Sequence, residues 1–351
     1  MERLNDDAWM SIFSRVPFPC HNKLRTLCLH ARNLLSSDAF HKARLESGYA
    51  ESGFIMAGGM GRYGLLGEHW FFTGGRWSLL NVSPLHRANA CSVVIDNELW
   101  VCGGNTGTCF DDQKWVCTKT VEVYSIATNS WYNQTSLNVG RDNAVCGVVA
   151  GLLVVAGGSC DRFGEFRRRL QATDTVEVYD PAIGKWIVSA PLPHATFSAT
   201  ACVLNERLFV AGGHCSGHNS NKLQIWDGKK WTLGASMPDA RCAAASVVHD
   251  GKMMVIGGYV HSDEDQEATR SVIVYDPKTD TWTDYKSLPY PRSYCRAMQN
   301  DGAIILVGDG KPMILKEGKW SFMHSCPKHL VWGKTYDDIT THSMSAGILV
   351  V

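Results

Sequence analysis

A pair of adjacent glycines follows an apolar run at regular intervals along this chain. The pattern occurs in FIMAGG (54–59), LWVCGG (99–104), LLVVAGG (152–158), LFVAGG (208–213) and MMVIGG (253–258), with a degenerate copy, ILVGDG, at 305–310. A tryptophan follows each copy, at Trp77, Trp131, Trp186, Trp231, Trp282 and Trp320. Self-similarity at a fixed period is typical of repeat architectures, in which each repeat is one small structural unit.

Each repeat has the pattern of four short antiparallel strands, which we call a to d. Strand a follows a basic residue, as in RANACSVVIDNE and RDNAVCGVVAG, and strand b ends at the glycine pair. A long loop leads to strand c, and a tight turn leads to strand d with its tryptophan. Because one small twisted sheet cannot bury both of its faces, we expect the sheets to pack around a common axis.

Large aromatic or apolar residues on strand c complete the repeat. A tyrosine lies seven residues before the tryptophan at Tyr124, Tyr179 and Tyr275, whereas Phe72, Trp226 and Leu315 lie five residues before it in the other copies. We expect these side chains and the tryptophans to fill the space between neighbouring sheets, which widens away from the axis.

The glycine pairs, tyrosines and tryptophans at these spacings resemble kelch repeats, which form the blades of a β-propeller. Residues 48–351 allow six repeats of roughly 51 residues each, close to the kelch period of about 50. The resemblance implies an all-β, six-bladed kelch β-propeller over 48–351, preceded by a short α-helical segment over 1–47.

The two ends of the predicted propeller complement each other. The first repeat has strands b, c and d but no strand a, and the last segment of the chain, THSMSAGILVV, has the pattern of a strand a. We therefore predict that the C-terminal strand completes the first blade and closes the ring.

Composition and charge argue against several classes of function. The chain has 34 basic and 34 acidic residues, so no overall field attracts it to nucleic acid or to an anionic membrane. Residues 143–160 carry no charge, but they contain four glycines and align with the repeat, which favours two strands and a turn over a membrane span. We expect no nucleic-acid partner and no membrane partner.

The cysteines and the start of the chain indicate a reducing compartment. Thirteen cysteines, an odd number, are scattered without the spacing of a disulfide framework, and MERLNDDAW lacks the apolar region of a secretory signal. We expect reduced thiols and a cytoplasmic or nuclear location.

Residues 4–46 show helical rather than strand periodicity. Asn5 or Asp6 can cap a first helix, Pro17 and Pro19 end it, and the apolar residues between Leu24 and Leu35 predict a second, amphipathic helix. A further helix is expected from Ser37 to Gly48. One interpretation is a helical cap that packs on the propeller.

A second interpretation comes from the motif LNDDAWMSIFSRVP followed by LRTLC and ARNLLSSDAF, which resembles an F-box. Asn5 stands where the family has proline, and Ala31 where tryptophan is usual. The resemblance implies binding of a Skp-type adaptor, and through it a cullin, by an exposed apolar face. The adaptor contacts that it implies are Leu4, Ile12, Phe13, Val16, Pro17 and Leu27.

The other partner is expected on the propeller face that carries the long loops, which span 105–119, 159–174, 214–222 and 259–270. Long loops on a rigid scaffold are where binding usually occurs. Trp115, Phe163 and Phe166 are candidate aromatic anchors, and the loops include basic residues at 167–169 and an acidic run at 262–267.

The residues that open strand a are expected to surround the channel mouth on that face. They are Arg87, Arg141, Arg241, Arg292 and His342, with Thr196 in one repeat. Converging guanidiniums suit carboxylates or phosphate, and some kelch substrate receptors use such arginines to grip acidic peptides. The alternative is that each arginine only bonds carbonyls of its own repeat.

Catalysis is not expected. His214, Cys215 and His218 lie close together in GGHCSGHNSN, but the sequence places no fourth metal ligand near them. We predict neither a metal site nor a cofactor. The sequence thus predicts a non-catalytic substrate receptor of a Skp–cullin–F-box ubiquitin ligase with an unknown protein substrate. The alternatives are a kelch scaffold for cytoskeletal or signalling proteins and an enzyme of small-molecule metabolism.

Overall fold

A computed structural model describes residues 5–61, 64–65, 68–73, 75–106, 116–160, 171–260, 267–308, 310–323 and 345–350. Leu4 and His342 lie outside these residues, as do Trp115, Phe163, Phe166, the basic residues 167–169 and most of the acidic run at 262–267. Among the described residues, no helix is long and apolar enough to span a membrane.

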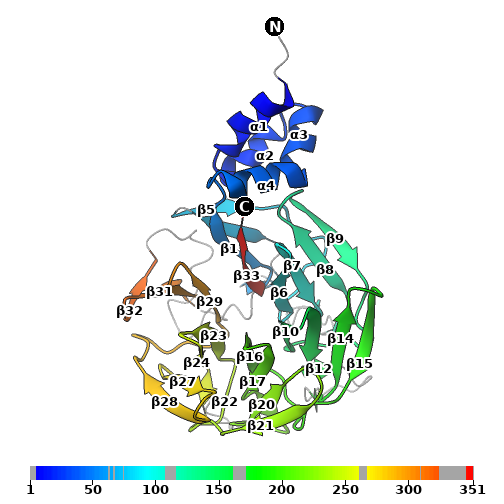
Figure 1. Ribbon diagram of the computed structural model, residues 1–351. Coiled ribbons are helices and arrows are strands. Elements are labelled where there is room, and N and C mark those ends of the chain that lie inside the picture. The colour runs from blue at the N-terminus through cyan, green and yellow to red at the C-terminus, as the bar shows by residue number, and fades with distance from the viewer. Residues whose placement is uncertain are drawn as a thin grey trace.

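The described strands form six four-stranded antiparallel sheets, arranged as blades around a common centre (Figure 1). Blade 1 contains β33 (Ser345–Val350), β1 (Ser52–Ala57), β4 (His69–Thr73) and β5 (Arg76–Leu79). Blade 2 contains β6 (Cys91–Ile95), β7 (Glu98–Cys102), β8 (Val121–Ser125) and β9 (Ser130–Gln134). Blade 3 contains β10 (Val145–Val149), β11 (Leu152–Ala156), β14 (Val176–Asp180) and β15 (Lys185–Ser189).

The remaining blades repeat the same order. Blade 4 contains β16 (Thr200–Leu204), β17 (Arg207–Ala211), β20 (Leu223–Trp226) and β21 (Trp231–Gly234). Blade 5 contains β23 (Ala245–His249), β24 (Lys252–Ile256), β27 (Val272–Asp276) and β28 (Thr281–Tyr285). Blade 6 contains β29 (Arg296–Asn300), β30 (Ala303–Val307), β31 (Met313–Lys316) and β32 (Lys319–Phe322). The prediction of an all-β propeller is confirmed.

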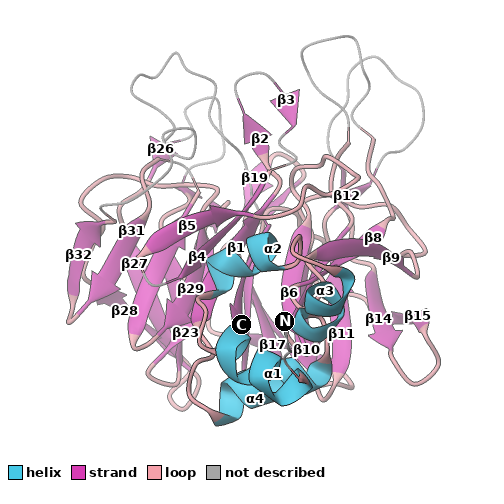
Figure 2. Cartoon of the chain, turned by 90° about the horizontal axis from the view of Figure 1, so that it is seen from above, coloured by secondary structure: helices cyan, strands magenta, loops and turns pink. Residues whose placement is uncertain are grey.

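Short strand pairs extend the loops between strands b and c on one face of the propeller. They are β2 (Met60–Gly61) with β3 (Gly64–Leu65), β12 (Ser159–Cys160) with β13 (Gln171–Ala172), β18 (His214–Cys215) with β19 (His218–Asn219), and β25 (Tyr259–Val260) with β26 (Glu267–Ala268) and β22 (Arg241–Cys242). Figure 2 shows these pairs rising from the same side of the molecule. We call this side the loop face.

Aromatic pairs across strands c and d pack in the space between blades, as the sequence predicts. Tyr179 faces Trp186 across β14 and β15, with the two ring centroids 5.3 Å apart. The indole N–H of Trp186 donates to the carbonyl oxygen of Thr135 in the preceding blade, at 2.8 Å. Four other strand-d tryptophans make the equivalent bond, at Trp131, Trp231, Trp282 and Trp320. Each of these rings therefore both fills the gap between blades and joins them.

The N-terminal segment contains α1 (Asp6–Ser14), a 3-10 turn (Phe18–Cys20), α2 (His21–Leu24), α3 (Leu29–Leu35) and α4 (Asp38–Glu46). Asn5 caps α1, because its Oδ1 accepts from the N–H of Ala8 at 2.9 Å, and Ser37 caps α4 in the same way through Phe40. The prediction of one continuous helix from Leu24 to Leu35 was wrong. The chain turns between α2 and α3, where Arg25 points inward and bonds the carbonyl oxygens of Leu35 and Ala127, and extended Cys28 caps α3.

The C-terminal strand lies between the other strands of blade 1 and the centre of the molecule (Figure 1). β33 pairs antiparallel with β1 over six residues, from Ser52 opposite Val350 to Ala57 opposite Ser345. Without β33, the backbone groups of one edge of β1 lose these partners, and an unpaired backbone group in a buried position is costly.

We therefore predict that removal of residues 345–351 abolishes the single cooperative melting transition. Circular dichroism during heating measures this transition, and removal of Val351 alone serves as the control. A shortened protein that melts with the cooperativity and midpoint of the full chain would contradict the prediction.

Candidate functional site

The residue that opens strand a joins its own blade to the preceding one through its backbone. We call Arg87, Arg141, Thr196, Arg241 and Arg292 the opening residues. The N–H of the second glycine in the preceding blade donates to the carbonyl oxygen of the opening residue in each case. These glycines are Gly59, Gly104, Gly158, Gly213 and Gly258, at N–O distances from 2.8 to 3.0 Å.

The glycine pair is required by the closeness of this joint. Gly103 and Gly104 have φ values of 66° and 97°, which favour glycine. A Cβ on Gly103 would lie 2.4 Å from the carbonyl oxygen of Arg141, and one on Gly104 would lie 2.7 Å from that of Ala88. A side chain on Gly103 would thus collide with the backbone of blade 3, and one on Gly104 with the backbone of its own blade.

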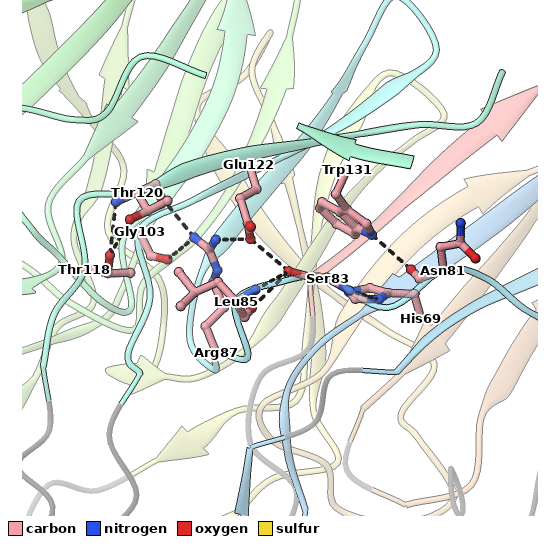
Figure 3. Close-up of polar contacts among 10 residues, drawn as sticks. All are labelled: His69, Asn81, Ser83, Leu85, Arg87, Gly103, Thr118, Thr120, Glu122 and Trp131. Atoms are coloured by element: carbon pink, nitrogen blue, oxygen red, sulfur yellow. Dashed lines mark hydrogen bonds and ion pairs between the residues drawn. The ribbon is translucent and has the colours of Figure 1, made fainter. Parts of the chain in front are cut away.

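The side chains of Arg87 and Arg141 bond within their own blades. Arg141 is 1% exposed, and its Nη1 donates to the carbonyl oxygens of Gly157 and Thr175, both at 2.9 Å. Its Nη2 contacts Glu177 Oε1 at 2.7 Å. Arg87 makes the same set of contacts, with Gly103, Thr120 and Glu122 (Figure 3).

The carboxylates of these ion pairs also accept hydrogen bonds from the segment that connects the preceding blade to their own. Glu177 accepts from the backbone N–H groups of Asn138 and Val139, at 2.6 and 3.3 Å. Glu122 accepts from the hydroxyl of Ser83, whose N–H donates to Nδ1 of His69 at 3.2 Å (Figure 3). Both ion pairs are therefore parts of the blade-to-blade joint.

Blades 4 and 5 show what happens when a member of the pair is replaced. In blade 4, Thr196 Oγ1 donates to the carbonyl oxygen of Gly212 at 3.0 Å, and Gln224 stands in place of the glutamate and bonds both backbone groups of His194. In blade 5, Arg241 has no buried carboxylate, and its contacts with Gly257, Asp239 and Ser271 are 3.3–3.4 Å long.

The expectation that Arg87, Arg141 and Arg241 present open guanidiniums at the channel mouth is therefore not met. Their side chains are 4%, 1% and 1% exposed, and their donors point into the blades. Arg292 is partly exposed, and its Nη2 donates to the carbonyl oxygen of Lys311 at 3.3 Å. The structure favours the alternative in which these arginines serve the repeat.

A second series of backbone hydrogen bonds joins neighbouring blades two residues after the opening residues. Asn89, Asn143, Ser198, Ala243 and Tyr294 all have φ between 49° and 59°, an uncommon conformation for residues other than glycine. The N–H of each of the last four donates to the carbonyl oxygen of the one before it, at 2.8–2.9 Å. This chain of bonds links blades 2 to 6.

Four partly exposed aromatic side chains lie beside these backbone bonds on the loop face. Phe197 and His214 bridge each other through the backbone, with their ring centroids 5.2 Å apart. The rings of Tyr259 and Tyr294 make an edge contact at 5.7 Å. We call these four residues the mouth aromatics. They come from blades 4 to 6, and rigid aromatic rings of this kind are common anchors for protein partners.

Sequence reasoning missed the mouth aromatics because it followed the residues that repeat. His214 and Tyr259 come directly after a glycine pair, and Phe197 and Tyr294 come one and two residues after an opening residue. These positions are fixed by the repeat, whereas the residue types at them differ between repeats. That combination of fixed place and variable side chain is the signal that could have identified them.

The predicted adaptor contacts separate into three groups. Ile12 and Leu27 are 50% and 61% exposed, and Pro17 is exposed as well. Val16 is half-buried. Phe13 is only 4% exposed and packs among the core residues of the helical segment, so its side chain is a structural element of that segment.

The described residues contain no group of three or more His, Cys, Asp or Glu side chains arranged to hold a metal ion. Nδ1 of His214 instead contacts Oδ1 of Asn219 at 3.0 Å within the β18–β19 pair.

Comparison with known proteins identifies the repeats. A family model described as the KLHDC2/KLHL20/DRC7 Kelch-repeats domain matches residues 117–309, and the Kelch motif matches residues 86–138. Kelch-like protein 35 from Homo sapiens is 36% identical over 260 residues, which cover 72% of this chain and 40% of that protein. Kelch-like protein 15 from Homo sapiens is 27% identical over 172 residues, which cover 46% of this chain and 28% of that protein.

The chain spans about two fifths of the length of Kelch-like protein 35, and both family matches begin after residue 85. Among solved structures, that of YjhT is similar, with a TM-score of 0.62 and 16% identity over 73% of this chain and 90% of that chain. At this identity the likeness concerns the fold alone.

The ion pair of blade 3 allows a double-mutant test of its structural role. Glu177→Gln or Arg141→Thr alone leaves a buried charge unpaired, which costs about 3–5 kcal/mol of unfolding free energy. The double variant reproduces the neutral pair of blade 4, Thr196 with Gln224, so we expect its cost to fall below the sum of the single costs by about 2 kcal/mol. Urea denaturation measures these values, and strictly additive costs would contradict the interpretation.

His69 predicts a dependence of stability on pH. Burial lowers the pKa of this imidazole from 6.5 to about 3. The unfolded chain therefore binds a proton that the folded chain does not, and stability falls as the pH drops below about 6.5, by up to about 1.4 kcal/mol per pH unit. Between pH 7 and pH 5, we expect the unfolding free energy of the unaltered protein to fall by about 2 kcal/mol more than that of the His69→Gln variant.

The exposed histidine His218 provides the control, since His218→Gln should leave this pH dependence unchanged. Equal losses in the His69→Gln variant and the unaltered protein would show that His69 does not titrate in this way.

Proposed function

The chain belongs to the kelch-repeat family, and on that basis we propose that it is the substrate-recognition subunit of a Skp–cullin–F-box ubiquitin ligase. The helical segment binds a Skp-type adaptor, and the six-bladed closed propeller binds the target protein on its loop face. The chain itself performs no bond chemistry, and it acts in the cytoplasm or the nucleus.

The observation that supports this proposal most strongly is the rigid attachment of the helical segment to the propeller wall (Figures 1 and 2). Phe18 is 3% exposed and packs in one cluster with Ile55, Phe71 and Tyr124 of blades 1 and 2. Its ring lies 5.3 Å from that of Phe71. Arg25 bonds the carbonyl oxygen of Ala127 in the turn between β8 and β9.

A second buried arginine fixes the helices to the start of β1. Arg44 is 1% exposed, and its Nη1 donates to the carbonyl oxygens of Ser14 and Val16, both at 2.7 Å. Its Nη2 donates to the carbonyl oxygen of Tyr49 at 2.7 Å and contacts Glu51 at 3.4 Å. An adaptor bound to the helices would accordingly keep one orientation relative to the loop face.

Apolar side chains on the helical segment remain uncovered. Ile12, Leu27, Leu29 and Leu45 are between 50% and 69% exposed, although the segment has a buried core of its own. Exposed apolar residues on short helices are the type of surface that a partner covers in helix-mediated docking. This feature favours a docking role over a purely structural cap.

The loop face supplies the target-binding surface in this proposal. The mouth aromatics lie beside the channel, on a scaffold whose blades are joined by the backbone bonds described above. Aromatic anchors of this kind dominate many protein interfaces. Target and adaptor bound to one rigid chain would raise the effective concentration of target lysines near a ubiquitin-loaded enzyme. A kelch scaffold without ligase function remains the competing hypothesis, and adaptor binding distinguishes the two.

We expect Ile12→Asp combined with Leu27→Asp to reduce co-purification with a recombinant Skp-type adaptor at least about tenfold, because each change places a charge in an apolar contact. Pull-down from purified components measures the complex. Phe13 is unsuited to this test because it belongs to the helical core.

Ile187→Asp is the matched control, since Ile187 is 48% exposed on β15 in blade 3. Unchanged melting of all variants shows that folding is intact. If the unaltered chain does not bind the adaptor, or if the double variant binds as well as the control, the ligase proposal fails and the scaffold hypothesis replaces it.

A further inference from the structure

A cavity of about 150 Å³ lies between the first strands of blades 2 to 6. Strands β6, β10, β16, β23 and β29 each contribute to its wall, and Figure 1 shows these strands nearest the centre of the propeller. Much of the wall consists of alanines, at Ala144, Ala199, Ala201, Ala245 and Ala297. Because these side chains are small, the inner strands leave space on the propeller axis. That space exceeds the roughly 30 Å³ that one water occupies.

Arg296, at the start of β29, also lines the cavity. Among the described lining residues it is the only arginine or lysine, and none of them is an aspartate or a glutamate. Its side chain is only partly exposed, and within the described part of the chain its guanidinium has neither a hydrogen bond nor an ion pair. Burial lowers the pKa of this guanidinium. The opening arginines differ, since each of them bonds backbone carbonyls.

Thiols occupy the place where a counter-ion would be expected. The charge of Arg296 interacts with Cys146, Cys91 and Cys295, three cysteines that also line the cavity. The thiol of Cys91 lies between those of Cys102 and Cys146, and hydrogen bonds from these two, together with Arg141 and Arg296, lower its pKa well below the usual range. Cys146 differs, because its hydrogen bond with Cys91 and its burial raise its pKa well above the usual range, so its neutral thiol is a weak hydrogen-bonding partner for the guanidinium.

We propose that the central channel binds a small oxyanion, such as phosphate or a short carboxylate, with Arg296 as its anchor. The planar guanidinium offers two parallel N–H donors, which match the oxygens of either group. The volume of about 150 Å³ is sufficient for one polyatomic anion of this size. This site is separate from the loop face and from the helical segment, so it does not depend on the proposed ligase function.

Binding at this position should stabilise the fold. The cavity wall includes residues from five blades, so an anion held there lies close to the inner strands of all five. A ligand that binds the folded state alone raises stability in proportion to the logarithm of its concentration above the dissociation constant. The bound anion would thus be a structural ligand at the centre of the propeller that stabilises the folded state.

The test is a thermal titration of the full chain with sodium phosphate, sodium acetate and sodium chloride at constant ionic strength. We expect phosphate or acetate, but not chloride, to raise the melting temperature with the logarithm of the anion concentration once it exceeds the dissociation constant, by about 3 °C at a hundredfold excess. The difference between the phosphate and acetate arms identifies the class of oxyanion. The rise should disappear in Arg296→Met and persist in Arg32→Met, which changes an exposed arginine on α3.

Two results would overturn the proposal. One is that phosphate and acetate raise the melting temperature of the unaltered chain no more than chloride does, and the other is an equal effect on Arg296→Met. If Arg296→Met does not fold, alkylation of Cys91 by iodoacetamide in the unaltered chain replaces the variant, because the lowered pKa of this cavity thiol favours the reactive thiolate. Saturable slowing of this reaction by phosphate or acetate supports the site, and an unchanged rate under both contradicts it.

Discussion

Blades 1 to 6 of this propeller are joined in order, within the described residues, by a hydrogen bond from the second glycine of one repeat to the carbonyl oxygen of the opening residue of the following repeat. The bond requires the two backbones to approach so closely that a Cβ on Gly103 of blade 2 would overlap the carbonyl oxygen of Arg141 in blade 3. The opening side chain then turns back to its own blade, where Arg141 holds the glycine carbonyl and a glutamate on strand c. One residue thus orients two sheets.

Much of the fold could be predicted because these joints repeat. The glycine pairs, the aromatic residues of strands c and d, and the role of residues 345–350 beside β1 all follow from self-similarity and from the number of strands in each repeat. The role of the arginines did not follow, because it depends on a partner more than thirty residues away. Glu122 and Glu177 lie on strand c, and the acid is replaced by Gln224 in the blade that has Thr196. This correlated change in charge was visible in the sequence.

The helical segment was less predictable for a similar reason. Its caps at Asn5 and Ser37 are local signals, but the break between α2 and α3 arises because Arg25 bonds a carbonyl oxygen of blade 2. Phe13 and Ile12 are adjacent in sequence, yet one lies in the helical core and the other is half exposed. Periodicity alone could not assign these two side chains, because the buried face of α1 is determined by packing against the other helices of the segment.

These contacts divide the molecule by role. The residues that recur in every repeat, from the glycine pair to the tryptophan, maintain the scaffold. Residues that differ between repeats occupy the loop face and the channel. The mouth aromatics and Arg296 are examples, since each stands at a position where the other repeats carry a different residue. The exposed apolar residues of the helical segment lie outside the repeats altogether, on helices that are fixed to blades 1 and 2.

Native-state hydrogen exchange tests the claim that the glycine bonds hold the blades together. If they do, the amides of Gly104, Gly158, Gly213 and Gly258 exchange only through global unfolding, with the same protection as the amides of the central strands β11 and β24. Exchange of these glycine amides many times faster than that of the central strands, under conditions where the sheets remain intact, would show that the blades separate locally and would contradict the account.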